Sequence, residues 1–262
     1  MLRATKDIPG VNWIGLWTII RRETVRITRS PVAFVAPWIS ALMFILIFGQ
    51  VIGQSLADIG GHRYLEFVLP GIVMMNIVSV SFAQSSGQVY YSRFQHYIEE
   101  ALIAPLSYAE MITGALAVVV VRSAVTALGI VLMAAAFGVT TIAHIGAFLF
   151  WTVMVSGVFA LLGMVVGLWA RNFEQLTVFN VFVITPLSFI GGVFNTTAML
   201  PGWLRNFAWF NPFFYFTNGL RNAMIGFHEG PSLVGPAFTT AAVCILALIV
   251  WRLYVTGWGI RE

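Results

Sequence analysis

Long stretches without charged residues divide this chain into six segments long enough to cross a membrane. Residues 31–57 contain no Asp, Glu, Lys or Arg, and five later stretches carry almost none. A spanning helix needs roughly 20 apolar residues, and an ionised group at mid-bilayer costs several kcal/mol, so such runs predict transmembrane helices. The expected spans are 33–56, 64–88, 109–137, 144–169, 175–194 and 233–254.

Residues 12–29 precede the first span and follow a different pattern. Apolar side chains recur at helical spacing on one face, and arginines share the opposite face. We expect an N-terminal amphipathic helix in the membrane interface, with its aromatic rings at headgroup level and its arginines on lipid phosphates. A soluble helix packed on another domain is the alternative. The two faces comprise Trp13, Leu16, Trp17, Ile20, Thr24 and Ile27, and opposite them Arg22, Arg26 and Arg29.

Residues 195–230, before the last span, are too aromatic for a solvated loop and too interrupted for a span. Pro201 suits the start of one short helix, and Asn211 and Pro212 supply an N-cap and a first-turn proline for a second. We expect a re-entrant pair of outer helices that dips into the outer leaflet and satisfies its own backbone groups. A seventh span over 212–230 is the alternative, although it would contain three ionisable residues.

Composition agrees with lipid as the solvent for much of the chain. Hydrophobic residues make up 59% and charged residues 9% of the 262 positions, whereas soluble domains carry about 25% charged residues. We therefore expect an all-α integral membrane protein in one domain, residues 1–262. It would have six transmembrane helices, the interfacial helix and the re-entrant helical hairpin before the last span.

The net charge of +4 is distributed as a membrane-orientation signal, which argues against a nucleic-acid partner. With cytoplasmic termini, ten basic residues lie on the cytoplasmic side and three outside, as the positive-inside rule requires. The inner set is Arg3, Lys6, Arg21, Arg22, Arg26, Arg29, Arg93, Arg171, Arg252 and Arg261, and the outer set is Arg63, Arg205 and Arg221.

We expect no catalytic, cofactor or metal site in this chain. A P-loop needs Gly, four residues and then Gly-Lys-Ser/Thr, but the one lysine, Lys6, has no glycine before it. Cys244 is the single cysteine, and the four histidines are scattered without metal-ligand spacing. Any ATP hydrolysis must therefore come from another polypeptide.

Arg122 interrupts the third span, near the middle of the membrane. An unpaired arginine there is costly, so it should face a partner or a polar cavity, in a structural or a substrate-binding role. An ion-coupled carrier is less well supported, because Glu66 and Glu110 lie near span ends. Candidate neighbours of the arginine are Gln84, Gln88, Ser123 and Thr126. Candidate residues of a translocation pathway are Glu66, Gln84, Arg122, Phe214 and Tyr215.

Gly163 and Gly167 lie four residues apart in the fourth span. Two small residues at this spacing let another helix approach closely. We expect that neighbouring helix to belong to the same subunit.

Nearly the whole chain, from about residue 13 to 261, resembles the type 2 ABC exporter permeases. The order and spacing of four short motifs within a six-span frame carry the resemblance. The subgroup is that of bacterial drug-resistance, nodulation-type and inner-membrane permeases. The motifs are Tyr-Leu-Glu-Phe-Val-Leu-Pro-Gly at 64–71, Ile-Glu-Glu-Ala-Leu-Ile-Ala-Pro-Leu-Ser at 98–107, Gly-Gly-Val-Phe at 191–194, and Asn211-Pro212 before Gly219-Leu220-Arg221.

The resemblance implies a bacterial inner-membrane complex of two permeases, expected as a homodimer, and two ATPase subunits that hold ATP and magnesium. Residues 12–29 would be the connecting helix, and the segment around 94–105 would carry the coupling helix that seats in the ATPase subunit. Candidate coupling residues are Phe94, Ile98, Glu99, Glu100, Leu102 and Pro105.

Substrate would move through the interface between the permeases. An aromatic-rich, nearly uncharged pathway suits export of an amphiphile, a drug or a lipid, out of the cytoplasm or the inner leaflet. Aromatic rings also stack on sugars, so a lipid-linked glycan or polysaccharide is the alternative substrate.

Overall fold

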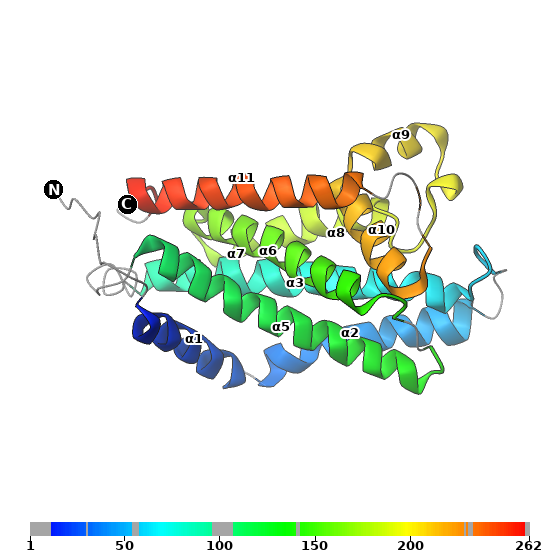
Figure 1. Ribbon diagram of the computed structural model, residues 1–262, viewed down its shortest axis with the longest axis horizontal. Helices are drawn as coiled ribbons and strands as arrows, with labels where there is room; N and C mark the ends of the chain where they lie inside the picture. The colour runs from blue at the N-terminus through cyan, green and yellow to red at the C-terminus, as the bar shows by residue number, and fades with distance from the viewer. Residues whose placement is uncertain are drawn as a thin grey trace.

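The chain forms a bundle of helices that run side by side along its long axis (Figure 1). Six helices of the described chain are long and apolar enough to cross a membrane, which confirms the predicted number. The computed structural model describes residues 12–29, 31–53, 58–95, 107–139, 142–227, 229 and 233–259. The helices of the spans are α2 (Pro31–Leu46) with the π-helical η1 (Ile47–Ile52), α3 (Tyr64–Phe94), α5 (Tyr108–Ala136), α6 (Ile145–Trp169), α7 (Phe173–Phe179) with the π-helical η2 (Asn180–Ile184) and α8 (Thr185–Ile190), and α11 (Val234–Thr256).

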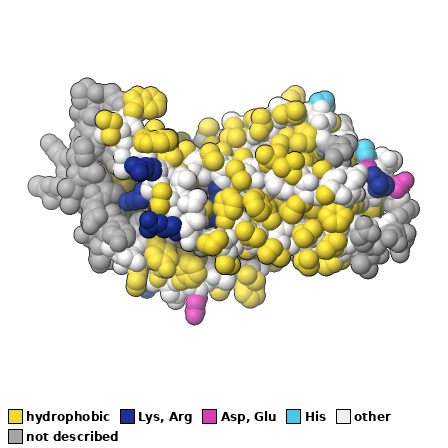
Figure 2. Space-filling model, turned by 90° about the horizontal axis from the view of Figure 1, so that it is seen from below, with side chains coloured by type: hydrophobic (Ala, Val, Ile, Leu, Met, Phe, Trp, Pro, Cys, Tyr) yellow, Lys and Arg dark blue, Asp and Glu magenta, His cyan; other side chains and the backbone are white. Residues whose placement is uncertain are grey.

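Helix α3 is the centre of the bundle. It is buried along most of its length, whereas α2, α11 and the α7–α8 segment bury few of their side chains and expose many apolar ones. Exposed apolar surface on a spanning helix is suited to lipid or to another membrane helix. Figure 2 shows hydrophobic side chains over much of one face of the molecule, with most of the Lys and Arg side chains on that face toward one end.

Small residues let α6 approach α3 closely. A Cβ atom added at Gly163 would lie 2.8 Å from the carbonyl oxygen of Phe82, and one at Gly167 would lie 2.7 Å from that of Ser86. The Ser85 hydroxyl also donates to the Ala160 carbonyl across the contact, at 2.6 Å. The prediction that these glycines serve a helix contact within the subunit is confirmed.

Helix α1 (Trp13–Thr28) lies along the first half of α5 (Figure 1). The Asn12 side chain caps α1 by accepting from the Gly15 amide, at 2.9 Å. The Asn12 amide in turn donates to Glu110, at 2.6 Å, and Glu110 forms a capping box with Ser107. The Glu110 carboxylate therefore joins the start of α1 to the start of α5. This role explains why an acidic residue stands at the beginning of the α5 span.

Two short helices lie at the end of the bundle opposite to α1 (Figure 1). Asn211 joins α9 (Gly202–Phe210) to α10 (Pro212–Ile225), after the single 3-10 turn η3 (Thr197–Met199). Its side chain accepts from the Phe213 amide at 3.0 Å, and proline follows it, so the predicted N-cap and first-turn proline are confirmed.

Helix α10 is too short to be a seventh span. It has 14 residues and ends at Gly226, whose φ of 72° is the left-handed conformation that commonly ends helices. Among the described residues, it is not one of the helices that could cross a membrane.

Arg221 anchors α10 to the bundle. Its side chain is fully buried and donates to the Gly192 carbonyl at 2.6 Å and to the Phe67 carbonyl at 3.3 Å. The guanidinium carbon lies 3.8 Å from the centre of the Phe67 ring, a cation–π contact. Burial lowers the pKa of Arg221 to about 10, partly offset by Glu229, so the group remains charged at pH 7.

Candidate functional site

A cavity of about 460 Å³ opens between α2, α3, α5 and η2. Its wall is mostly apolar, and its polar groups are hydroxyls, amides and one guanidinium, that of Arg122. The described residues of the lining include no Asp, Glu, His or Cys, so they offer no metal-binding set. The lining residues are Ala33, Ala36, Pro37, Ser40, Phe44, Ile72, Met75, Asn76, Ser79, Val80, Ala83, Gln84, Arg122 and Asn180.

Asn180 reaches the cavity from an irregular stretch of the fifth span. The five residues of η2 are π-helical and lie directly before α8, whose first turn contains Pro186. The Thr185 hydroxyl donates to the Asn180 carbonyl at 3.1 Å. Such π-helical stretches are common at functional sites.

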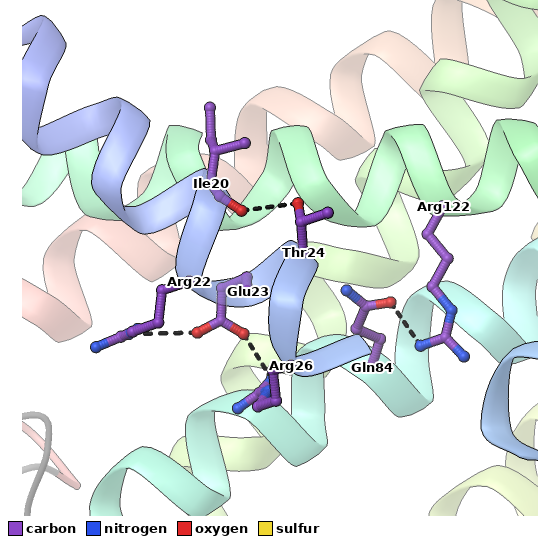
Figure 3. Close-up of polar contacts among 7 residues, drawn as sticks. All are labelled: Ile20, Arg22, Glu23, Thr24, Arg26, Gln84 and Arg122. Carbon is purple, nitrogen blue, oxygen red and sulfur yellow. Dashed lines mark hydrogen bonds and ion pairs between the residues drawn. The ribbon is translucent and has the colours of Figure 1, made fainter. Parts of the chain in front are cut away.

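Pro37 explains how Arg122 is held. A proline inside a helix has no backbone N–H, so the carbonyl four residues earlier, that of Ala33, loses its helical donor. The guanidinium Nη2 of Arg122 donates to this carbonyl oxygen at 2.7 Å. Its Nη1 donates to the side-chain oxygen of Gln84, also at 2.7 Å (Figure 3). Arg122 thus joins α2, α3 and α5 at one edge of the cavity.

The sequence places Arg122 near the middle of the third span, and the structure places its guanidinium beside the start of the first span. Its guanidinium contacts Ala33, the third residue of α2, and therefore lies close to one end of the first span. Helix α5 has 29 residues and is roughly 44 Å long, which exceeds the roughly 30 Å of the hydrocarbon layer. A residue halfway along α5 can therefore reach the membrane boundary, because its side chain points toward the N-terminus of the helix.

Of the four candidate neighbours of Arg122, Gln84 is the one that the structure pairs with its side chain. Ser123 forms a hydrogen bond with Ser81 at 2.8 Å. The Thr126 hydroxyl donates to the backbone carbonyl of Arg122 at 2.9 Å. The signal missed in the sequence was Pro37, which predicts an unpaired carbonyl that a donor such as arginine can satisfy.

Helix α1 carries a buried glutamate that pairs with two exposed arginines near this edge (Figure 3). Glu23 is 1% exposed, and its carboxylate lies 2.7 Å from Arg26 and 3.3 Å from Arg22. Sequence analysis did not single out Glu23, although it follows Leu16 and Ile19 at helical spacing. Those two residues pack against Gly114 of α5.

The aromatic residues of α1 lie outside its packed face. Trp13 is 71% and Trp17 is 66% exposed, so they do not share the surface that Leu16 presents to α5. At helical spacing the tryptophans lie on one exposed side of α1, while Arg22 and Arg26 lie on the other exposed side. Exposed Trp beside Arg is typical of the region between lipid tails and water.

The remaining candidate pathway residues lie elsewhere. Glu66 is at the opposite end of α3, where it bonds to Arg63 at 3.0 Å and lies 3.7 Å from His62. Phe214 and Tyr215 line a second cavity of about 230 Å³ beside α6, α9, α10 and α11. The structure therefore brings together Gln84 and Arg122, but not the other three.

The candidate coupling segment is described only at its beginning. Phe94 ends α3 and is 71% exposed, with its ring 6.2 Å from that of Tyr90. Next to it, Arg93 donates to the carbonyls of Gly167 and Ala170 at the end of α6. The other candidates lie outside the described residues: Ile98, Glu99, Glu100, Leu102 and Pro105.

Comparison with known proteins identifies the family to which these features belong. Residues 15–225 match the ABC-2 type transporter family. The inner membrane transport permease YadH of Escherichia coli is 30% identical over 252 residues, covering 95% of this chain and 98% of YadH. Nodulation protein J of Rhizobium leguminosarum bv. trifolii is 25% identical over 84% of each chain. The protein of the same name from Rhizobium meliloti is 23% identical over 92% of this chain and 90% of its own.

Proposed function

The chain belongs to the ABC-2 type transporter family, and on this premise we propose that it exports an amphiphilic substrate, a drug or a lipid. It is the multi-pass permease of an inner-membrane transporter. Permeases of this family lack the ATPase domain and pair with ATP-binding subunits. ATP hydrolysis therefore belongs to the ATP-binding partner subunit. The alternative of an ion-coupled carrier does not agree with membership of this family.

The cavity beside Arg122 is the observation that carries the proposal of an amphiphilic substrate. Its wall combines apolar residues such as Phe44, Ile72 and Met75 with a short polar edge. A volume of about 460 Å³ lies within the usual range for a ligand pocket, roughly 300–1,000 Å³. A molecule with an apolar body and one polar group matches such a surface.

The second cavity favours the alternative substrate, a lipid-linked glycan. Aromatic side chains surround it, and such rings can stack on sugar units. Tyr215 and Glu229 add polar groups at its edge. Its aromatic residues are Phe150, Trp151, Trp209, Phe214 and Tyr215.

Charge supports an orientation with both termini in the cytoplasm. Of the eleven described arginines, eight lie toward the α1 end of the bundle, Arg122 included, and three lie toward the α9–α10 end (Figure 1). By the positive-inside rule, the α1 end faces the cytoplasm. Helix α1 would then be the interfacial connecting helix, and α9 and α10 would be the re-entrant pair in the outer leaflet.

We assign coupling to the segment that follows α3. Phe94 supports this, because an exposed aromatic ring at the cytoplasmic end is suited to contact with a partner. Two copies of the chain, as a homodimer, would assemble with two ATPase subunits. Glu99 and Glu100 would face basic residues of the ATPase subunit.

Inside-out vesicles containing the chain and its ATPase partner test this function. We expect ATP-dependent uptake of a fluorescent phospholipid or an amphiphilic dye, and none with the chain alone. Exchange of Glu99 and Glu100 for Arg should reduce both uptake and co-purification of the ATPase, because like charges would meet at the contact. Exchange for Ala should be milder, because exposed ion pairs contribute only about 0–1 kcal/mol.

Three outcomes would contradict parts of the proposal. Uptake restricted to a lipid-linked glycan would favour the alternative substrate. ATP hydrolysis by the pure chain would contradict its role as a permease without ATPase activity. Normal recovery of the ATPase with the double Arg variant would move the coupling contact to another cytoplasmic segment, such as the 171–174 turn.

A further inference from the structure

The cavity beside Arg122 carries a positive charge that its own lining does not neutralise. Among the described residues, fourteen line the cavity, and they include one ionisable side chain and no carboxylate. Within the described part of the chain, Arg26 of α1 adds a further positive charge near Arg122 and is itself paired with Glu23. A cation in a partly apolar cavity is costly unless an anion accompanies it.

Two hydrogen bonds hold the guanidinium of Arg122 in place, and its other N–H groups can donate to a ligand. The group carries five N–H donors. One Nη1 hydrogen is directed at Gln84 and one Nη2 hydrogen at Ala33. These contacts hold the planar group from two sides at the edge of the cavity. A guanidinium positioned in this way is suited to a phosphate or carboxylate, which it can bind with two parallel hydrogen bonds.

We propose that Arg122 binds the anionic group, a phosphate or carboxylate, of an amphiphile that enters the cavity from the cytoplasmic leaflet. This inference rests on the proposed export function, since it names the substrate class of the same cavity. The guanidinium lies level with the start of α2, where the proposed orientation puts the lipid headgroups, and the apolar wall beyond it would receive the chain of the amphiphile. Arg22 and Arg26 on α1 add positive charge along the approach.

The competing role for Arg122 is purely structural, as the donor that satisfies the Ala33 carbonyl. Pro37 separates the two roles. Replacing Pro37 with Ala restores a backbone N–H four residues after Ala33, so the carbonyl no longer needs the arginine. A Pro37→Ala, Arg122→Gln double variant should therefore remain folded even where Arg122→Gln alone does not. Loss of anion binding in that double variant isolates the ligand-binding role.

The test uses the full chain, purified without an ATPase, in nanodiscs of phosphatidylcholine. Dodecyl phosphate is the probe, and dodecyltrimethylammonium of equal chain length is its control. We expect the phosphate to bind in preference to the ammonium. Arg122→Gln and the double variant should each weaken phosphate binding on the order of tenfold or more, as for the loss of a charged hydrogen bond. Pro37→Ala alone should retain binding.

Arg252→Gln is the matched control, because Arg252 is exposed at the same end of the bundle but does not line the cavity. Unchanged phosphate binding in the folded double variant, or equal binding of the ammonium probe, would overturn the inference. Competition by added phosphatidylglycerol would identify a membrane lipid as a source of the anion. Competition by inorganic phosphate would identify a free anion as a source.

The nanodisc test measures binding and not transport, so the proposals of an anion site and of ATP-driven export can be refuted separately. Failure of the binding test leaves ATP-driven export standing. Failure of the vesicle assay leaves an anion site without a transport role.

Discussion

The contact between α3 and α6 allows a prediction whose magnitude follows from the geometry. In Gly163→Ala, the new Cβ would lie 2.8 Å from the Phe82 carbonyl oxygen and 3.0 Å from the Ser86 amide nitrogen. Both atoms belong to the backbone of α3, so neither can move aside as a side chain would. Overpacking of this kind typically costs about 1–3 kcal/mol. We expect the variant to lose that much stability.

Gly157 supplies the control on the same helix. A Cβ there would meet only the Val243 side chain, at 3.9 Å, which is an ordinary van der Waals distance. Removing a helical glycine stabilises by roughly 0.5–1 kcal/mol, so Gly157→Ala should be neutral or slightly stabilising. The comparison between the two variants therefore removes the general effect of exchanging glycine for alanine.

Thermal unfolding in detergent, followed by size-exclusion chromatography with fluorescence detection, measures the difference. A loss of 1–3 kcal/mol corresponds to a midpoint lower by roughly 2–10 °C for a chain of this size. Gly167→Ala should act in the same direction, because its Cβ would lie 2.7 Å from the Ser86 carbonyl oxygen. Equal midpoints for Gly163→Ala and Gly157→Ala would refute the close backbone contact.

Two further predictions concern the ends of the bundle. Arg221→Met should lower stability by about 1–3 kcal/mol, because it leaves a buried carbonyl without a donor; the exposed Arg205→Gln is the control, and equal melting midpoints would contradict the anchoring role. In a Cys244→Ser background, a membrane-impermeant thiol reagent should label a cysteine at Asp58 from outside and one at Asn172 only from the cytoplasm. External labelling at Asn172 would reverse the orientation.

Much of the fold could be predicted from the sequence because lipid imposes simple requirements. Every backbone group must be satisfied within a span, so a long uncharged run such as residues 31–57 has few alternatives to a helix. The start of α10 could also be predicted from Asn211 and Pro212, because a helix cap depends on residues that are neighbours along the chain. The spacing of Gly163 and Gly167 also predicted a close helix contact, but it did not identify α3 as the neighbouring helix.

The candidate site depended on contacts between distant residues, which no local pattern contains. The partner of Arg122 on α2 is 89 residues away, and Gln84 is 38 residues away. The position of Arg122 beside the start of α2 was not predictable, because periodicity places a residue along its own helix but not relative to the ends of neighbouring helices. Glu66 shows the same limit, since it lies near the end of the bundle opposite to Arg122.

The sequence by itself determined the family, the six spans and the absence of a P-loop, because composition, motif order and span length are properties of the chain alone. Tertiary structure decided which polar groups meet. Pro37 removes a donor in one helix, and a guanidinium from another helix replaces it. Glu23 is buried because α1 packs along α5, not because of its place among arginines. Both effects arise when helices pack side by side, so they depend on distances that sequence spacing does not encode.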